Sequence, residues 1–161
     1  MTQTTIVGID YSLTSPCVCV NDGEKIMFYY LTKKKKHLGK IADNIIGEEH
    51  QEYNTPIERF TNISTWVMSK LPKSLKVYIE GYSFGSKGQA IFQIAENCGI
   101  LKYRLQEANI PYETIVPSVV KKGATGKGNA DKDMMYEAFN KETKIDLKKL
   151  FDTDKVGNPI S

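Results

Sequence analysis

The sequence lacks several features, and each shortage excludes a class of protein. No apolar run approaches the roughly 18 residues that a membrane-spanning helix requires. The first residues have neither the basic start nor the apolar stretch of a signal peptide. Only three cysteines occur, without a Cys-x-x-Cys pair, so we expect reduced thiols in the cytoplasm and no metal cluster built on them. The two histidines, His37 and His50, have no zinc-ligand spacing, and we expect both on the surface.

What the chain does contain is typical of one soluble globular domain. Its 161 residues are 40% hydrophobic and 25% charged, and we expect a single domain over 1–161. The net charge is only +3, but the lysines are clustered. This clustering indicates a surface that binds a polyanion, although a solvated loop remains an alternative for the first cluster. The two clusters are Lys33, Lys34, Lys35 and Lys36, and Lys121, Lys122, Lys127 and Lys132.

The first third of the chain predicts three antiparallel strands. Residues 5–10, 16–20 and 25–31 are rich in β-branched and aromatic residues, and Asn21-Asp22-Gly23 is a strong hairpin signal. The polar stretch 32–55 shows little periodicity, so we expect a long loop that is functional or partly ordered by a ligand. A helix should follow over 56–71, because apolar residues recur there at helical spacing up to Pro72.

The rest of the chain alternates strands and helices. We expect a strand over 75–80, a glycine-rich loop over 81–88, a helix over 89–108 and a strand over 112–116. A short helix should run from Pro117 to Lys122, followed by a flexible basic loop over 123–129. A last helix should begin at 130 and run to 139, with an extension towards 149 after a break near Asn140. The predicted order is therefore β-β-β-α-β-α-β-α, without an internal repeat.

Two acids occupy unusual positions for a purely structural role. Asp10 and Glu80 each end an apolar strand and are followed at once by a turn or a glycine-rich loop. If the two strands are parallel neighbours, both carboxylates point into one cleft. They would then repel each other unless a hard divalent cation such as Mg²⁺ lay between them, as in two-metal phosphodiester cleavage. A capping or salt-bridge role for either acid remains an alternative.

Other kinds of chemistry find less support. The segment Gly123–Gly128 looks like a phosphate loop but lacks the Walker spacing and the terminal Ser or Thr, so we expect no nucleotide cofactor. Ser12 and Ser83 have no evident histidine partner, which argues against a serine nucleophile.

Three segments together resemble a known family. Gly8-Ile9-Asp10-Tyr11-Ser12-Leu13-Thr14 is similar to the first motif of RuvC-type Holliday-junction resolvases, within the RNase H-like superfamily. Ile79-Glu80 resembles the second motif, and Val120-Lys121 with the stretch from Gly126 to Lys132 resembles the third region. The resemblance implies an α/β fold of RNase H-like type, with a mixed five-stranded sheet and helices on both faces.

The resemblance also implies a function. The expected protein is a homodimeric, Mg²⁺- or Mn²⁺-dependent endonuclease that cuts four-way or branched DNA junctions, without a membrane or nucleotide partner. Asp10 and Glu80 match the first two metal ligands, and Lys121 and Lys132 match lysines near the scissile phosphate. The family's base-stacking aromatic falls at Ser83, so Tyr82 or Phe84 is the candidate to replace it, with ordinary packing of these rings on the sheet as the alternative. The residues expected at DNA are Ser12, Tyr82, Ser83, Phe84, Lys87, Lys121, Lys122, Lys127 and Lys132, together with Lys33, Lys34, Lys35 and Lys36.

The end of the sequence departs from the family pattern. The family carries further aspartates, spaced Asp-x-x-Asp, on a last helix, whereas Gly157 and Pro159 argue against a helix here. We expect that helix beyond Ser161, so that 1–161 is a truncated form with impaired activity. Asp152 or Asp154 is the lesser alternative for a third ligand. The compact chain favours a phage origin.

Two other functions remain open at this point. A structure-selective DNA-binding module could keep the same fold without turnover, with salt-dependent junction binding. An RNA–DNA hybrid nuclease would prefer a strand that carries 2′-hydroxyl groups. An actin-like ATPase shares the first strand and turn, but 161 residues hold only about one of its two domains.

Overall fold

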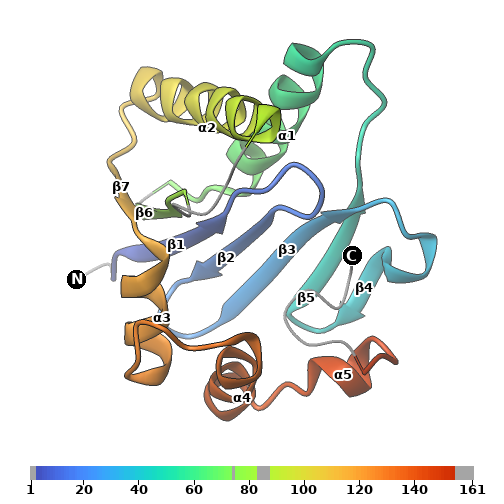
Figure 1. Cartoon of the computed structure of the whole chain (residues 1–161), viewed down its shortest axis with the longest axis vertical. Helices are drawn as coiled ribbons and strands as arrows, with labels where there is room; N and C mark the ends of the chain where they lie inside the picture. Colours follow the sequence, from blue (N-terminus) through green and yellow to red (C-terminus); the bar gives the residue numbers. More distant parts are fainter. Residues whose placement is uncertain (1–2, 74, 83–87, 155–161) are drawn as a thin grey trace.

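The computed structural model describes residues 3–73, 75–82 and 88–154, and strands in these ranges form one seven-stranded mixed sheet (Figure 1). The predicted opening is confirmed: β1 (Thr5–Asp10), β2 (Cys17–Asn21) and β3 (Ile26–Thr32) pair antiparallel. The turn between β2 and β3 is held by its own side chains. Asn21 accepts from the Gly23 amide at 2.9 Å, and Gly23 has a φ of 92°. Gly23 suits this turn because glycine tolerates a positive φ, and Asn21 suits it because its side chain accepts from the backbone two residues on.

The long loop expected over 32–55 is wrong. This stretch contains a 3-10 turn, η1 (Lys35–His37), and two further strands, β4 (Gly39–Ala42) and β5 (Ile45–Glu49). β5 pairs parallel with β3, and β4 pairs antiparallel with β5 at the sheet edge. These two strands raise the predicted count of five to seven, within the expected α/β class.

The order of the strands brings the functional segments to one edge of the sheet. The order is β4-β5-β3-β2-β1-β6-β7, where β6 is Leu75–Glu80 and β7 is Tyr112–Ile115. Five strands run in the same direction: β1, β3, β5, β6 and β7. β2 is antiparallel to both β1 and β3, so these two run the same way, and the remaining three join them through parallel pairings. Their carboxyl ends therefore share one edge, which we call the carboxyl edge. Asp10, Glu80, the lysines after β3 and the segment after β5 all lie along it.

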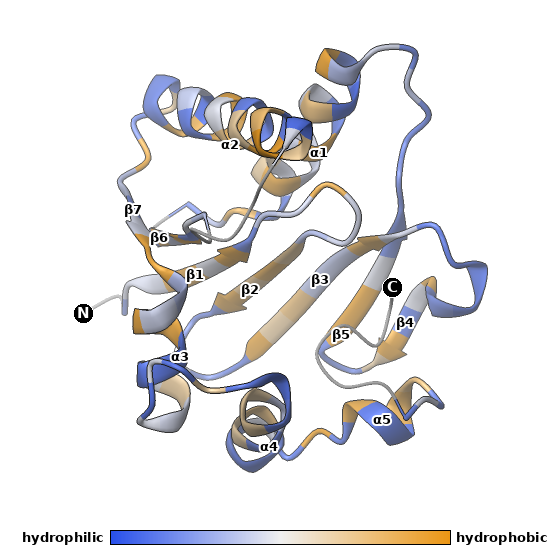
Figure 2. Cartoon of the chain, viewed as in Figure 1, coloured by the Kyte–Doolittle hydropathy of each residue, from blue (hydrophilic) through white to orange (hydrophobic). Residues whose placement is uncertain are grey.

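The main core lies between the sheet and two helices, α1 (Pro56–Lys70) and α2 (Gln89–Glu107). Figure 1 shows both helices on one side of the sheet, and Figure 2 shows hydrophobic residues along the central strands that they cover. Val7 and Ile9 of β1 point into this core, and Leu101 and Leu105 of α2 are fully buried against it. Since side chains alternate along a strand, Asp10 must face the opposite side of the sheet.

Three shorter helices lie on that opposite side: α3 (Pro117–Thr125), α4 (Lys132–Thr143) and α5 (Leu147–Leu150) (Figure 1). The expected flexible loop over 123–129 is partly wrong, because α3 continues to Thr125 and ends at Gly126, which has a φ of 81°. The expected break near Asn140 falls later, at Lys144, where the backbone turns left-handed. None of the described helices is long and apolar enough to cross a membrane.

Candidate active site

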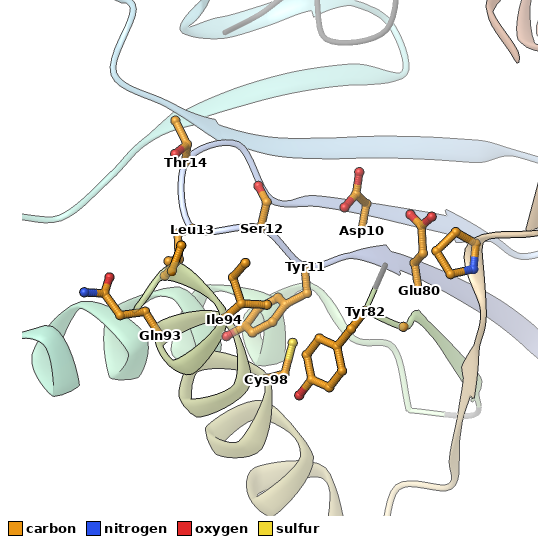
Figure 3. A pocket seen from close by; sticks show the side chains of 13 residues that line it. Asp10, Tyr11, Ser12, Leu13, Thr14, Glu80, Tyr82, Gln93, Ile94 and Cys98 are labelled. Atoms are coloured by element: carbon orange, nitrogen blue, oxygen red, sulfur yellow. The ribbon is translucent and has the colours of Figure 1, made fainter. Parts of the chain in front are cut away.

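The two predicted acids meet at the carboxyl edge. β1 and β6 are parallel neighbours with Ile9 opposite Ile79, so Asp10 and Glu80 leave the sheet side by side. Figure 3 shows both carboxylates pointing to the same side. Both line a cavity of about 440 Å³ at the edge and a second, more apolar cavity of about 730 Å³ under the sheet. The condition on which the cleft depended, a parallel pairing of these strands, is therefore met.

The surroundings disfavour a negative charge on either acid. Burial raises the pKa of Asp10, even though its side chain is reached by solvent. Burial also raises the pKa of Glu80, the charge of Asp10 raises it further, and the ammonium of Lys121 opposes both effects. Two partly desolvated carboxylates that repel each other form an oxygen-rich site whose charge a cation relieves. The pair therefore fits a hard divalent cation.

The described residues supply no third acid to this pair. No group of three or more His, Cys, Asp or Glu in the described ranges could hold a metal ion. Asp152 and Asp154 lie within those ranges, so the structure does not bring them to Asp10 and Glu80 as ligands. The Asp-x-x-Asp helix expected beyond Ser161 lies outside the described residues and stays a prediction.

The residues around the acids form a shaped wall. Tyr82 follows β6, is 40% exposed, and carries the Lys102 ammonium 5.5 Å from its ring centroid. Ser12 accepts a hydrogen bond from the Ser15 amide at 3.0 Å, which closes the turn after Asp10. Both residues line the 440 Å³ cavity, and their expected contact with DNA stays a prediction. The other expected loop residues, Ser83, Phe84 and Lys87, lie outside the described residues.

The expected lysines occupy different places. Lys121, on α3, is close enough to Glu80 to lower the pKa of that acid, whereas Lys122 and Lys127 are exposed nearby in the chain. Lys132 is the exposed first residue of α4, and it lines neither cavity that the acids share. Its expected catalytic role stays a prediction. The exposed run beyond β3 lies at the carboxyl edge and consists of Lys33, Lys34, Lys35 and Lys36.

The surface position expected for both histidines is wrong for His37. His37 is 4% exposed and packs edge-on against Phe151, with ring centroids 5.1 Å apart. His50 is half-buried, and its Nε2 lies 2.7 Å from the Thr14 carbonyl oxygen. Arg59, which the sequence interpretation did not single out, donates to the neighbouring Leu13 carbonyl at 2.9 Å. No sequence pattern marks His50 or Arg59, because each contacts a backbone carbonyl that lies far away in the chain.

Comparisons with known proteins agree with this arrangement. The chain is 28% identical over 120 residues to the crossover junction endodeoxyribonuclease RuvC of Brachyspira hyodysenteriae, across 70% of this chain and 71% of the relative. The solved structure of Thermus thermophilus RuvC covers 96% of this chain and 84% of its own, with 15% identity and a TM-score of 0.58. The structure of T. thermophilus RuvC in complex with a Holliday junction substrate covers 97% of this chain and 84% of its own, with 16% identity and a TM-score of 0.61. No protein-family model matches the sequence.

The mixed sheet with helices on both faces is an α/β fold that matches the fold of the RuvC structures, and the acid pair lies at its carboxyl edge. In sequence and in fold, the chain is similar to RuvC. The resemblance noted in the sequence motifs is thereby confirmed. The similarity does not bear on a phage origin, which stays a prediction.

Proposed function

We propose that this chain is an endonuclease that resolves four-way or branched DNA junctions and depends on Mg²⁺, with Mn²⁺ as a substitute. The observation that carries the proposal is the parallel pairing of β1 with β6, which places Asp10 and Glu80 together at the sheet edge. The sequence relative is a crossover junction endodeoxyribonuclease, and one structural neighbour was solved with a Holliday junction substrate. These findings support the same substrate class for this chain.

The acids are proposed to hold the divalent cation in their ionised forms. When bound, the cation supplies the Lewis acidity that phosphodiester hydrolysis requires. The desolvation that raises the pKa of both acids also strengthens their attraction for a cation. Lys121 lies near Glu80 and adds a positive charge where the scissile phosphate is expected. It is therefore proposed as a phosphate-positioning residue.

Contacts outside the acid pair are proposed to recognise the junction. Tyr82 has an exposed ring beside the acids, and stacking on an unpaired base contributes about 1–3 kcal/mol per base. The lysines at the carboxyl edge and on α3 would bind phosphates. We also propose a homodimer, because two symmetric cuts in a four-way junction require two acid pairs and the described chain carries one.

The proposal is tested by comparing substrates and acid variants in one assay. A four-way DNA junction, a matched linear duplex and an RNA–DNA hybrid are incubated with Mg²⁺ or Mn²⁺ and the protein extended by any residues that follow Ser161 in its gene, because the 161-residue form is expected to cleave poorly. We expect metal-dependent cleavage of the junction alone, and loss of cleavage in Asp10→Asn and Glu80→Gln with junction binding retained. Unchanged cleavage in both variants would contradict the proposed site. Tight junction binding without cleavage in either metal would favour a binding module, and preferred cleavage of the hybrid would favour a hybrid nuclease.

A further inference from the structure

The turn that follows Asp10 is held from outside by two side chains. Arg59 Nη2 donates to the Leu13 carbonyl at 2.9 Å, and His50 Nε2 lies 2.7 Å from the Thr14 carbonyl oxygen. A carbonyl oxygen only accepts hydrogen bonds, so the proton must be on Nε2 of the imidazole. Leu13 and Thr14 line the 440 Å³ cavity together with the two acids. The two donors therefore fix backbone that forms part of the site wall.

His50 lies in the connection between β5 and α1, and Arg59 lies in the first turn of α1; the junction between the connection and the helix is well anchored. Thr55 caps α1 by accepting from the Glu58 amide at 3.1 Å, and Glu58 in turn accepts from the Asn54 amide at 2.7 Å. This reciprocal arrangement is a capping box shifted by one residue, and it fixes where the chain enters the helix. Arg59 lies in the first turn of that helix, so its guanidinium projects from a fixed base.

The immediate surroundings keep both donors in place. The Arg59 guanidinium lies 5.3 Å from the ring centroid of Tyr53, a cation–π contact that restricts its rotation. Burial lowers the pKa of His50, the hydrogen bond to Thr14 opposes this, and the charges of Arg59 and Lys33 lower it further. At neutral pH the imidazole is thus the neutral donor form, and the contact with Thr14 does not depend on a charge.

We propose that His50 and Arg59 are positioning residues that hold the Leu13–Thr14 turn, and through it Asp10 and Ser12, in the geometry that cleavage requires. This inference rests on the proposed nuclease function. Ser12 and Asp10 are joined to the turn by only a few bonds, so a shift of the turn moves both. A displacement of about 1 Å at a reacting centre can lower a rate about a hundredfold. Neither donor needs to touch DNA or metal for this effect.

The test exploits two histidine variants of different reach. In His50→Gln the amide nitrogen occupies roughly the place of Nε2 and keeps the donor, whereas in His50→Asn the amide is too short to reach Thr14. We expect single-turnover cleavage of a four-way junction to fall about tenfold to a hundredfold in His50→Asn and Arg59→Gln, with junction Kd unchanged within about twofold. His50→Gln should restore most of the rate. Lys70→Met is the control, because this lysine lies at the far end of α1 and pairs with Glu48.

A second measurement separates this inference from the proposed function. Amide hydrogen exchange at residues 12–15, measured on the free protein, should speed up in His50→Asn and Arg59→Gln but not in His50→Gln or Lys70→Met. If His50→Asn and Arg59→Gln cleave the junction and exchange their amides at the same rates as the wild type, the positioning role is contradicted and the proposed nuclease function is unaffected. If exchange is faster in His50→Asn and Arg59→Gln but the wild-type protein cleaves no junction, the positioning of the turn stands and the proposed nuclease function is contradicted.

Discussion

Glu80 and Asp10 are coupled: burial raises the pKa of Glu80, and the adjacent Asp10 carboxylate raises it again. The coupling follows from the parallel register of β1 and β6, which sets Ile9 opposite Ile79 and leaves the two acids adjacent. The fold thus holds two like charges together in partly desolvated positions. Such an arrangement opposes folding stability at neutral pH and favours cation binding.

The acid pair should make stability depend on pH. A carboxyl whose pKa is raised by folding stabilises the fold below its unfolded pKa, and that stability is lost as the pH rises through the folded pKa. Asp10→Asn removes one charge of the pair, so without metal it should raise Tm at pH 7 relative to wild type. The difference should disappear as the pH falls to about 3, where Asp10 and Glu80 of the wild type and Glu80 of the variant are protonated. Thermal unfolding followed by circular dichroism from pH 3 to pH 8 measures it; a lower Tm for the variant at pH 7 would contradict the pairing.

Divalent metal should stabilise the native protein through the same acids. A ligand at about 100 times its Kd adds about 2.7 kcal/mol to the unfolding free energy, or about 5–10 °C in Tm for a chain of this size. We expect such a rise with Mg²⁺ or Mn²⁺ at pH 7, and none in the double variant Asp10→Asn, Glu80→Gln. Calcium-free buffer with a chelator provides the baseline. An equal metal-induced rise in the double variant would place the metal elsewhere.

Lys121 should act on Glu80 and not only on DNA. Its charge lowers the pKa of Glu80, so Lys121→Met should raise that pKa further and reduce cleavage about tenfold or more at neutral pH. Lys122→Met is the matched control for the pKa of Glu80, since Lys122 is the exposed neighbour on α3 and does not contribute to that pKa. Carbon-13 NMR titration of the Glu80 carboxyl reads the effect without DNA. A Glu80 titration that is the same in both variants would refute the assigned contact.

The sequence predicts the parts of this protein that local patterns encode. Asp10 and Glu80 are recognisable because a charged residue that ends an apolar strand next to a turn is unusual. The extra strands β4 and β5 were missed because β5 pairs in parallel with β3, and no hairpin turn in the sequence signals a parallel pairing. Gly47 also breaks the apolar alternation. A side chain there would collide with the His37 carbonyl and the Tyr30 side chain, so the close packing requires glycine. Because glycine is uncommon inside strands, this residue made the segment look unlike a strand in the sequence.

The missed contributors to the site share one physical cause. His50 contacts Thr14 across 36 residues, and Arg59 contacts Leu13 across 46. Both contacts use backbone carbonyls, which every residue type provides, so no pairing of side chains in the sequence signals them. They arise only once β5 lies beside β3 and brings its carboxyl end to the site edge.

The core beneath the site should tolerate little loss of volume. Leu101 is fully buried in the cluster between α2 and the sheet, where Val7 and Val77 pack from β1 and β6. Leu101→Ala should lower the unfolding free energy by about 2–5 kcal/mol, because it removes buried methyl groups and leaves a cavity. Urea unfolding measures the change. Ile57→Ala, on the exposed side of α1, is the control and should cost less than about 1 kcal/mol.

The lysine run after β3 should contribute to DNA affinity through charge alone. Lys34, Lys35 and Lys36 are exposed at the same carboxyl edge as the acids, so their substitution by Gln should weaken junction binding. Each phosphate contact contributes about 0.9 to the slope of log K against log salt, so the triple variant should lower that slope by up to about 2.7. Lys25, Lys73 and Lys76 provide a matched control, since these exposed lysines lie near the amino ends of β3 and β6, at the opposite edge. Fluorescence anisotropy from 50 to 300 mM salt, roughly the range over which such contacts are screened, compares the two triple variants at equal net charge. An equal loss of slope in both would mean that net charge, and not the placement of the run at the site edge, governs binding.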